Sequence, residues 1–396
     1  MKILILSDIE ASGEWLALQT LINYFKRDNP TCEFHLIAFG ENRLLLEKQV
    51  FKNVSIIKKP IFKRPFKYYR QLIVEFIEAV KTIRKVKQSF QDTKIIMGTH
   101  HLLLLSSFVI FPFKPKFFYF QGFRHFYKIS PYRFNHYMII IKLLERLAFL
   151  LSNKLIVPSK FALKILKNEL GIFAFLKKFY ILSNMCRPQF SKKYTQTELQ
   201  LFRKKYHLNN KVKYIVYAGI IDKRKSIYEL IQGYSRLIKH TNKIKLVIAH
   251  LSVKLDINYY YKIQRLIQNN KLEKNIIFLR DLDAFDLAKL FRVANLGILP
   301  TKFETYSLFT REALESSLPI IATKTGEIGV LLKKFSSELI LQNISASGIY
   351  NSLIKFFNLS GLEMRDLKKR MKKELYLMHK KTTSVKELEE IFSTTS

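Results

Sequence analysis

Short apolar runs alternate with longer segments of helical spacing along most of the chain. The first run, Ile3–Ser7, is followed by a loop with Ser12 and Gly13 and by a helical pattern near Trp15–Phe25. Runs of this length predict buried strands, and apolar residues three or four positions apart predict the helices that cover them. Further strands predicted in the first half are Phe34–Ala38, Val54–Ile57, Ile95–Met97, Phe117–Phe120 and Leu155–Val157. This alternation indicates parallel strands joined by crossover helices.

The alternation stops in one polar stretch and then begins again. Residues 186–210 lack a clear apolar period, so we place a junction between two domains there. Strands predicted after it are Tyr214–Ala218, Lys245–Ala249, Ile276–Leu279, Leu296–Leu299 and Ile320–Thr323. The sequence therefore predicts an α/β fold with two Rossmann-like domains, over residues 1–190 and 211–375, with a junction at 191–210. Ligands of such sheets bind beyond the carboxyl ends of the strands.

Two glutamates follow one of the predicted strands. Glu304 lies in the loop after Leu296–Leu299, and Glu312 lies in a helix that begins near Ser307 and Leu308. Free backbone N–H groups at the start of a helix bind anions, and a carboxylate such as Glu312 can accept two hydrogen bonds from the vicinal hydroxyls of a ribose. The alternative is that both are ordinary acids near a helix end, where the helix dipole favours them.

The block from Ala294 to Leu331, "ANLGILPTKFETYSLFTREALESSLPIIATKTGEIGVLL", resembles the signature of glycosyltransferases with the GT-B fold, family 4 type. The matching positions are Pro300, Glu304, Glu312, Ala313, Pro319, Ala322, Thr323 and Gly326. The resemblance implies two Rossmann-like domains facing across a cleft, with the acceptor on the N-terminal domain and the nucleotide sugar on the C-terminal domain. By analogy with related folds, residues 376–396 would form a helix that returns to the N-terminal domain.

Other segments are similar to the same family in the same order. "YAGIIDKRKSIYELIQGY" resembles its phosphate loop, and the N-terminal strand and glycine loop, "LIVPSKFALKIL" and "YILSNMCRPQF" also match. The resemblance implies transfer with retention, no metal and no other cofactor, and Glu304 in contact with the sugar ring. The residues implied for donor binding are Gly13, Gly219, Arg224, Lys225, Ser307, Leu308 and Glu312.

Four positions depart from the family pattern. Ile220 stands where the family usually has a phosphate-binding arginine, although Lys223, Arg224 or Lys225 could supply that charge, and Ser226 and Ser307 each replace a glycine. Gln121 stands where many members have a histidine that the resemblance assigns to catalysis. Glutamine can hydrogen-bond but cannot carry a proton. Ile220 and Gln121 therefore favour an alternative, a non-catalytic protein that binds a nucleotide sugar or a glycan on the same fold.

Two histidines end a predicted strand. A neutral His100, or its neighbour His101, could orient an acceptor hydroxyl; the alternative is a packed side chain. The histidines, cysteines and acids show no metal-ligand spacing. We therefore list Glu304, Gln121 and His100 as the candidate catalytic residues and expect no metal site.

Charge and aromatic residues suggest a partner surface. The chain carries 68 basic and 31 acidic side chains, and residues 51–190 alone carry 26 and 5. Basic residues are interleaved with aromatic ones in Lys58–Leu72 and Phe111–Lys142, a pattern that suits an anionic membrane surface. Two alternatives remain: aromatic core residues with solvated lysines, and single-stranded nucleic acid. We expect a membrane and no nucleic acid, and an acceptor of the lipid-linked, surface polysaccharide or lipopolysaccharide type.

The remaining composition bears on location. No run of about 18 apolar residues predicts a membrane-spanning helix, and the N-terminal run is too short and too acidic for a signal peptide. Cys32 and Cys186 do not make a disulfide framework, which fits a reducing cytoplasm. We therefore expect a cytoplasmic protein that is peripheral on the inner face of the membrane.

Overall fold

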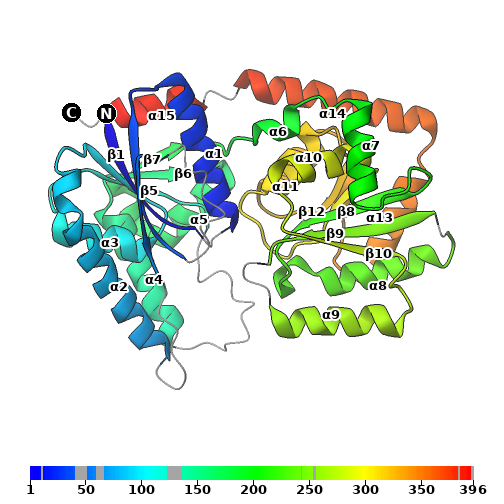
Figure 1. Cartoon of the computed structure of the whole chain (residues 1–396), viewed down its shortest axis with the longest axis horizontal. Helices are drawn as coiled ribbons and strands as arrows, with labels where there is room; N and C mark the ends of the chain where they lie inside the picture. Colours follow the sequence, from blue (N-terminus) through cyan, green and yellow to red (C-terminus); the bar gives the residue numbers. More distant parts are fainter. Residues whose placement is uncertain are drawn as a thin grey trace. The chain divides into compact units, whose positions relative to one another are not determined.

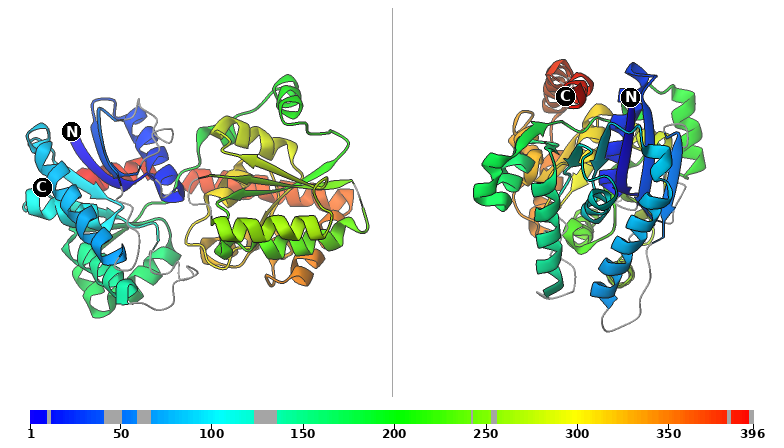
Figure 2. Two further views of the ribbon diagram at one scale, coloured as in Figure 1. Left: turned by 60° about the horizontal axis from the view of Figure 1, so that its bottom comes forward. Right: turned by 90° about the vertical axis from the view of Figure 1, so that its left-hand side faces the viewer.

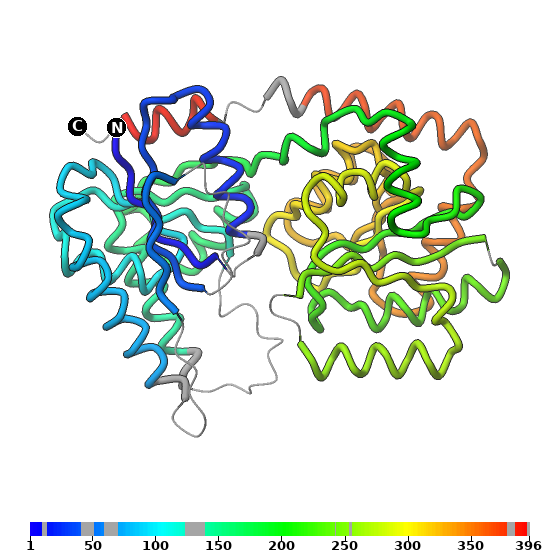
Figure 3. The backbone as a smooth tube through the Cα atoms, viewed as in Figure 1, coloured from blue at the N-terminus to red at the C-terminus, as the bar shows by residue number. Residues whose placement is uncertain are grey.

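The structure, a computed structural model, describes residues 1–9, 12–40, 51–58, 67–122, 136–241, 243–252, 256–381 and 384–393 (Figure 3). The chain divides into two compact units, the first formed by Met1–Met185 and Thr383–Ser396 and the second by Cys186–Thr382. The first unit therefore ends at Met185, five residues before the end of the N-terminal domain predicted from the sequence, residue 190. The predicted junction at 191–210 also contains a regular helix, α7 (Gln196–Lys205), which Thr195 and Glu198 cap reciprocally.

The first unit is built on a parallel sheet in the order β3-β2-β1-β4-β5-β6-β7. Its strands are β1 (Lys2–Asp8), β2 (Glu33–Phe39), β3 (Asn53–Ile57), β4 (Ile95–Gly98), β5 (Lys116–Tyr119), β6 (Lys154–Val157) and β7 (Lys178–Ile181). Its helices are α1 (Ser12–Asp28), α2 (Lys67–Lys85), η2 (Lys87–Phe90), α3 (His101–Ile110), α4 (His136–Leu151), α5 (Lys160–Leu170), η4 (Gly171–Leu176) and α15 (Ser384–Ser393).

Cores cover both faces of the central strands β1, β4, β5 and β6, which explains why these strands are nearly continuous apolar runs. Successive residues of β1 point to opposite faces. Ile3 and Ile5 join a core with α1 and α15, whereas Leu4 and Leu6 join a separate core with α2, α3, α4 and α5. A one-residue shift in register would exchange these two sets of contacts.

The end of the chain belongs to the first unit. The helix α15 lies beside α1 (Figure 1), and its residues Leu388, Ile391 and Phe392 are buried in the core there. The ring of Phe392 packs against those of Phe25 and Phe117, 5.4 and 6.2 Å away between centroids. In the same place, Lys154 Nζ donates a hydrogen bond to the carbonyl of Ile391, 2.5 Å away. The core of the first unit therefore includes α15, which is distant in sequence from the other elements of that unit.

The second unit is built on a parallel sheet in the order β10-β9-β8-β11-β12-β13. Its strands are β8 (Lys213–Gly219), β9 (Ile244–His250), β10 (Ile276–Arg280), β11 (Leu296–Leu299), β12 (Ile320–Thr323) and β13 (Ile340–Leu341). Its helices, besides α7, are α6 (Pro188–Ser191), η5 (Lys223–Lys225), α8 (Ile227–Ile238), α9 (Ile257–Asn269), α10 (Ala284–Val293), α11 (Leu308–Glu315), α12 (Gly326–Lys333), η6 (Ser337–Leu339), α13 (Ala346–Phe357) and α14 (Gly361–Lys381). Helices lie on both faces of this sheet (Figure 2).

Each sheet reverses its strand order once. In the first unit the reversal lies between β1 and β4, and in the second it lies between β8 and β11. At such a point the loops from the two strands diverge to opposite faces and leave room for a ligand beyond the carboxyl ends. Four candidate residues lie near these strand ends: Gly13 in the first turn of α1, His100 after β4, Gly219 at the end of β8 and Glu304 after β11.

No helix within the described ranges is long and apolar enough to cross a membrane.

Candidate functional site in the second unit

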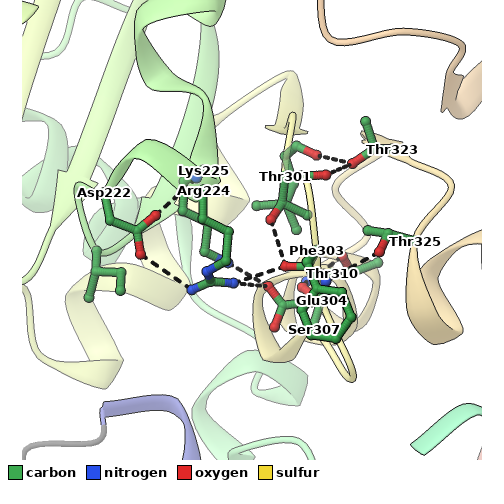
Figure 4. A network of polar contacts seen from close by, with 12 residues as sticks. Asp222, Arg224, Lys225, Thr301, Phe303, Glu304, Ser307, Thr310, Thr323 and Thr325 are labelled. Atoms are coloured by element: carbon green, nitrogen blue, oxygen red, sulfur yellow. Dashed lines mark hydrogen bonds and ion pairs between the residues drawn. The ribbon is translucent and has the colours of Figure 1, made fainter. Parts of the chain in front are cut away.

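Three charged side chains converge where the second sheet reverses its order (Figure 4). Lys225 Nζ lies 2.5 Å and Arg224 Nη1 lies 3.4 Å from Glu304 Oε2. The two cations belong to η5, after β8, and Glu304 belongs to the loop after β11. The sequence predicted all three as site residues, and the parallel pairing of β8 with β11 brings them together.

Arg224 and Lys225 are held in place by the turn that carries them. Asp222 caps η5 by accepting a hydrogen bond from the backbone N–H of Lys225, 2.9 Å away. The guanidinium of Arg224 also donates to the carbonyl oxygen of Phe303, 2.9 Å away. Burial lowers the pKa of Lys225, nearby Arg224 lowers it further, and the Glu304 carboxylate opposes this. Both cations are therefore oriented before any ligand is considered.

Hydrogen bonds to the end of β12 and to the segment after it hold the loop that carries Glu304. Thr323 Oγ1 donates to the carbonyl oxygen of Thr301, 2.5 Å away, and the N–H of Glu304 donates to Thr325 Oγ1, 3.2 Å away. Gly326 has a φ of +56°, and a Cβ on it would lie 2.0 Å from the carbonyl oxygen of Glu304. No other residue type fits at Gly326 without moving the loop, which explains why this match to the family pattern is a glycine.

The helix α11 begins beside this cluster. Ser307 is its N-cap, and its hydroxyl accepts hydrogen bonds from Thr310 N at 3.1 Å and Thr310 Oγ1 at 3.0 Å. The serine that replaces a family glycine therefore serves as the cap, which serine does well. Leu308 is the first residue of α11 and is half-buried. The first N–H groups of this helix are an anion-binding arrangement of the kind found at helix N-termini.

Glu312 is buried and has a partner that the sequence did not reveal. Arg187 binds it with two parallel hydrogen bonds, from Nε to Oε1 at 2.6 Å and from Nη2 to Oε2 at 2.9 Å. Arg187 precedes α6, and its guanidinium also stacks over the ring of Phe190. The two partners are 125 positions apart in sequence, and no local motif links them.

The loop after β8 shows how the chain accommodates two departures from the family. Gly219 has a φ of +150°, and a Cβ on it would lie 3.1 Å from the hydroxyl of Tyr217. That hydroxyl donates to the carbonyl oxygen of Ile220, 2.6 Å away. Ser226, which replaces a glycine, adopts the left-handed conformation with a φ of 51°. A non-glycine residue is strained there, so the family's glycine has a conformational reason.

The candidate residues of the first unit form an uncharged group. Gln121 and Asn184 exchange two hydrogen bonds, of 2.8 and 3.0 Å, and Tyr119 Oη donates to Asn184 Oδ1, 2.6 Å away. His100 lies at the carboxyl end of β4, but its ring is buried and stacks on His101 with 4.9 Å between centroids, as in the alternative of a packed histidine.

Several expectations concern residues at the edge of what is described. Gly13 lies in the first turn of α1. Of the two basic aromatic segments, residues 59–66 and 123–135 lie outside the described residues. Cys32 and Cys186 are both free thiols. In the described part of the chain, no three histidine, cysteine or acidic side chains are grouped as metal ligands would be.

Comparisons with known proteins identify the family that part of the chain resembles. Residues 200–376 match the family described as Glycosyl transferases group 1. The chain is 19% identical over 199 residues to the N-acetyl-alpha-D-glucosaminyl L-malate synthase of Bacillus anthracis, which is 50% of each protein. It is 24% identical over 132 residues to an uncharacterized glycosyltransferase of Methanocaldococcus jannaschii, over 33% of this chain and 32% of that protein. These matches span at most half of the length of either curated relative.

Solved structures match over the whole chain. A glycosyltransferase from Rickettsia africae ESF-5 superimposes with a TM-score of 0.73 and 15% identity, over 100% of this chain and 99% of that one. HepE of Anabaena, solved with UDP and glucose, gives a TM-score of 0.73 with 16% identity over the same shares. At this identity the likeness concerns the fold, and it confirms the predicted class: α/β, of the GT-B type with two Rossmann-like domains.

Proposed function

Residues 200–376 belong to the glycosyl transferases group 1 family, and from this premise we propose that the protein is a glycosyltransferase. It moves a sugar from a nucleotide-sugar donor to an acceptor, with the donor on the second unit and the acceptor on the first. The observation that carries the proposal is the convergence of Arg224, Lys225 and Glu304 where strands β8 and β11 diverge. One of the two matched relatives is named as an uncharacterized glycosyltransferase, and the other as an N-acetyl-alpha-D-glucosaminyl L-malate synthase.

The charges of the site suit a diphosphate leaving group. In the proposed reaction, the bond between the anomeric carbon and the diphosphate oxygen breaks as a bond to the acceptor oxygen forms. The electron pair stays on the departing diphosphate oxygen, which takes up the proton that the acceptor hydroxyl loses on the same face of the sugar. Arg224, Lys225 and the first N–H groups of α11 stabilise the negative charge that develops there. Because these groups supply positive charge, we propose a reaction that needs no metal. We assign Glu304, which both cations contact, to the hydroxyls of the donor sugar.

The ribose would bind at Glu312. Each carboxylate oxygen there accepts one hydrogen bond from Arg187 and has a second lone pair for a hydroxyl. Arg187 would also cancel a negative charge that otherwise repels the diphosphate. We therefore assign Arg187 the role of a positioning residue, which fixes the carboxylate and neutralises it.

The finer features of the function are proposals of the same kind. We propose transfer with retention on one face of the sugar, because one carboxylate, Glu304, is the candidate on the sugar side. We propose a glycan or glycolipid acceptor near the membrane, of the surface polysaccharide or lipopolysaccharide type, with the enzyme at the inner face. The support is the basic charge of residues 51–190.

A second candidate function is a non-catalytic protein that binds nucleotide sugars. Gln121 favours it, because its amide is bonded to Asn184 and cannot exchange a proton as a histidine would. The two functions differ in turnover and agree in nucleotide binding.

The test is donor cleavage by the Glu304→Ala variant. We expect release of the nucleoside diphosphate to fall by about 10²-fold or more, while calorimetry still detects nucleotide binding. The matched control is Glu273→Ala, which removes an exposed acid of the same unit. Equal turnover by Glu304→Ala and the wild type would remove the proposed role of Glu304. No donor cleavage by the wild type, together with nucleotide binding, would favour the binding protein.

A further inference from the structure

The first unit exposes a set of large apolar side chains on α4 and on the adjacent short helix η4. Leu143, Leu147 and Leu151 are spaced four residues apart and lie on the solvent side of α4. The segment "GIFAFL" of η4 is entirely apolar, yet none of its residues is buried. Ile172 and Phe175 are 76% and 79% exposed. Large exposed apolar groups of this kind mark interaction sites.

Ion pairs and a hydrogen bond tie α4 and its C-terminal end to the residues on either side of η4. Lys142 and Arg146 of α4 both form ion pairs with Glu169, at 2.8 and 3.0 Å, and Glu169 lies in the last turn of α5, immediately before η4. At the other end, Lys177 Nζ donates to the carbonyl oxygen of Ser152, 3.0 Å away, just after α4. The residues Leu143, Leu147, Leu151, Ile172, Phe175 and Leu176, which we call the α4–η4 surface, therefore lie in one region.

The segments that carry this surface are basic. Residues 136–185 contain the exposed or half-buried side chains Lys142, Arg146, Lys160, Lys164, Lys167, Lys177 and Lys178, besides Lys154, which is buried next to α15. The same stretch contains two acids: Glu145, which is buried, and Glu169, which is already paired. A second copy of the chain would bring the same excess of positive charge against this surface, so self-association is disfavoured by repulsion.

We propose that the α4–η4 surface docks the protein on a bilayer that contains anionic lipid. Side chains such as Phe175 and Ile172 would enter the interfacial layer, and the lysines and arginines around them would contact lipid phosphates. The surface differs from the basic aromatic segments that the sequence singled out, because it begins at Leu143 and extends to Leu176. It depends on the proposed function only for its purpose, which is to hold the enzyme near a membrane-linked acceptor.

The experiment is co-sedimentation of the full chain with vesicles. We expect binding to vesicles of phosphatidylcholine with phosphatidylglycerol to be at least about tenfold stronger than to phosphatidylcholine alone, and to weaken with added salt. The variant Ile172→Ser/Phe175→Ser should lose at least about tenfold in binding. The control, Ile257→Ser/Tyr261→Ser, removes two side chains of similar exposure from α9 of the second unit and should bind as the wild type does.

Several results would overturn the proposal. The first is a wild type that does not bind the anionic vesicles, and the second is a double variant of η4 that binds them normally. The third is a concentration-dependent dimer in sedimentation velocity that the η4 variant abolishes, because a second copy would then cover the surface. Nucleotide binding measured on the same preparations keeps the two proposals separate, since vesicle binding and donor binding can each fail alone.

Discussion

Each unit contains a pair of polar side chains joined by two hydrogen bonds, and the pair is neutral in the first unit and charged in the second. In the first unit the amides of Asn184 and Gln121 exchange two hydrogen bonds. In the second unit Arg187 and Glu312 form a bidentate ion pair. Asn184 and Arg187 belong to the same short connecting segment. Neither amide of the neutral pair titrates. In the charged pair, removal of one partner leaves the other partner's charge uncompensated. In this comparison the charged pair lies in the unit where we propose that the anionic donor binds.

Arg187→Ala should have the largest effect, because it leaves the buried carboxylate of Glu312 without its bidentate partner. We expect the free energy of unfolding of the second unit to fall by about 3–5 kcal/mol. Chemical denaturation measures this change. Arg265→Ala, which removes an exposed arginine from α9, is the control and should change the free energy by less than about 0.5 kcal/mol.

The double variant Arg187→Ala/Glu312→Ala sharpens this prediction. If an unpaired charge causes the loss, removing that charge as well should restore part of the stability. Additive losses from the two substitutions would show that Arg187 acts through packing on Phe190 and not through Glu312.

Asn184→Ala should have a smaller effect on the first unit. It removes the acceptor for Tyr119 Oη and one partner of Gln121, so we expect a loss of about 1–3 kcal/mol in the free energy of unfolding. Because amides do not titrate, the loss should be the same at mildly acid and mildly alkaline pH. Asn168→Ala, at an exposed position of α5, serves as the control. A loss that varied with pH would contradict the neutral character of the pair.

The pH dependence of nucleotide binding tests Lys225. Burial, with help from Arg224, lowers the pKa of Lys225 from 10.5, and the protonated amine is the form that attracts a diphosphate. Affinity should therefore fall as pH rises through that lowered pKa, below the ordinary range of lysine. In Lys225→Arg the guanidinium stays charged, so the fall should move to higher pH. An identical pH profile for both proteins would exclude titration of Lys225 as the cause.

Ser226→Gly should have the smallest effect on the free energy of unfolding, and it should stabilise the protein where the other substitutions destabilise it. Ser226 has a φ of 51°, and its buried hydroxyl has no hydrogen-bond partner in the described part of the chain. A glycine relieves the strained conformation but gains freedom in the unfolded chain. We expect a net gain of about 0.5–1 kcal/mol in thermal unfolding. A loss of stability would mean that the hydroxyl has a role that these contacts do not reveal.

The sequence predicted the second unit well because its signals are local. Strand β8 was predicted as Tyr214–Ala218 and runs from Lys213 to Gly219, and the loops after β8 and β11 hold the residues that the family pattern named. The parallel order of strands then brings together residues such as Lys225 and Glu304. Once the fold class is known, motifs at the ends of strands therefore suffice to predict which residues lie close together.

The failures have physical causes. Helix α3 was not predicted, because nearly all of its residues are buried and its apolar run has no period. Helix α7 was treated as a junction, although Thr195 and Glu198 are a capping-box signal that could have located its start. The pairing of Arg187 with Glu312 could not be predicted, since it depends on the packing of α6 against α11 and not on any local pattern.

The most direct test of the central claim is calorimetric binding of nucleotides to the wild type, Lys225→Ala and Lys239→Ala. The ligands are UDP, GDP, ADP, CMP and dTDP, free and as sugar conjugates. We expect one nucleotide to bind, and Lys225→Ala to weaken it by about 1.5–3 kcal/mol, the value of a hydrogen bond to a charged group. Lys239 is exposed at the end of α8, and its removal should change nothing. Binding that is equal in Lys225→Ala and the wild type, or absent for every nucleotide, would contradict the assignment of the donor site.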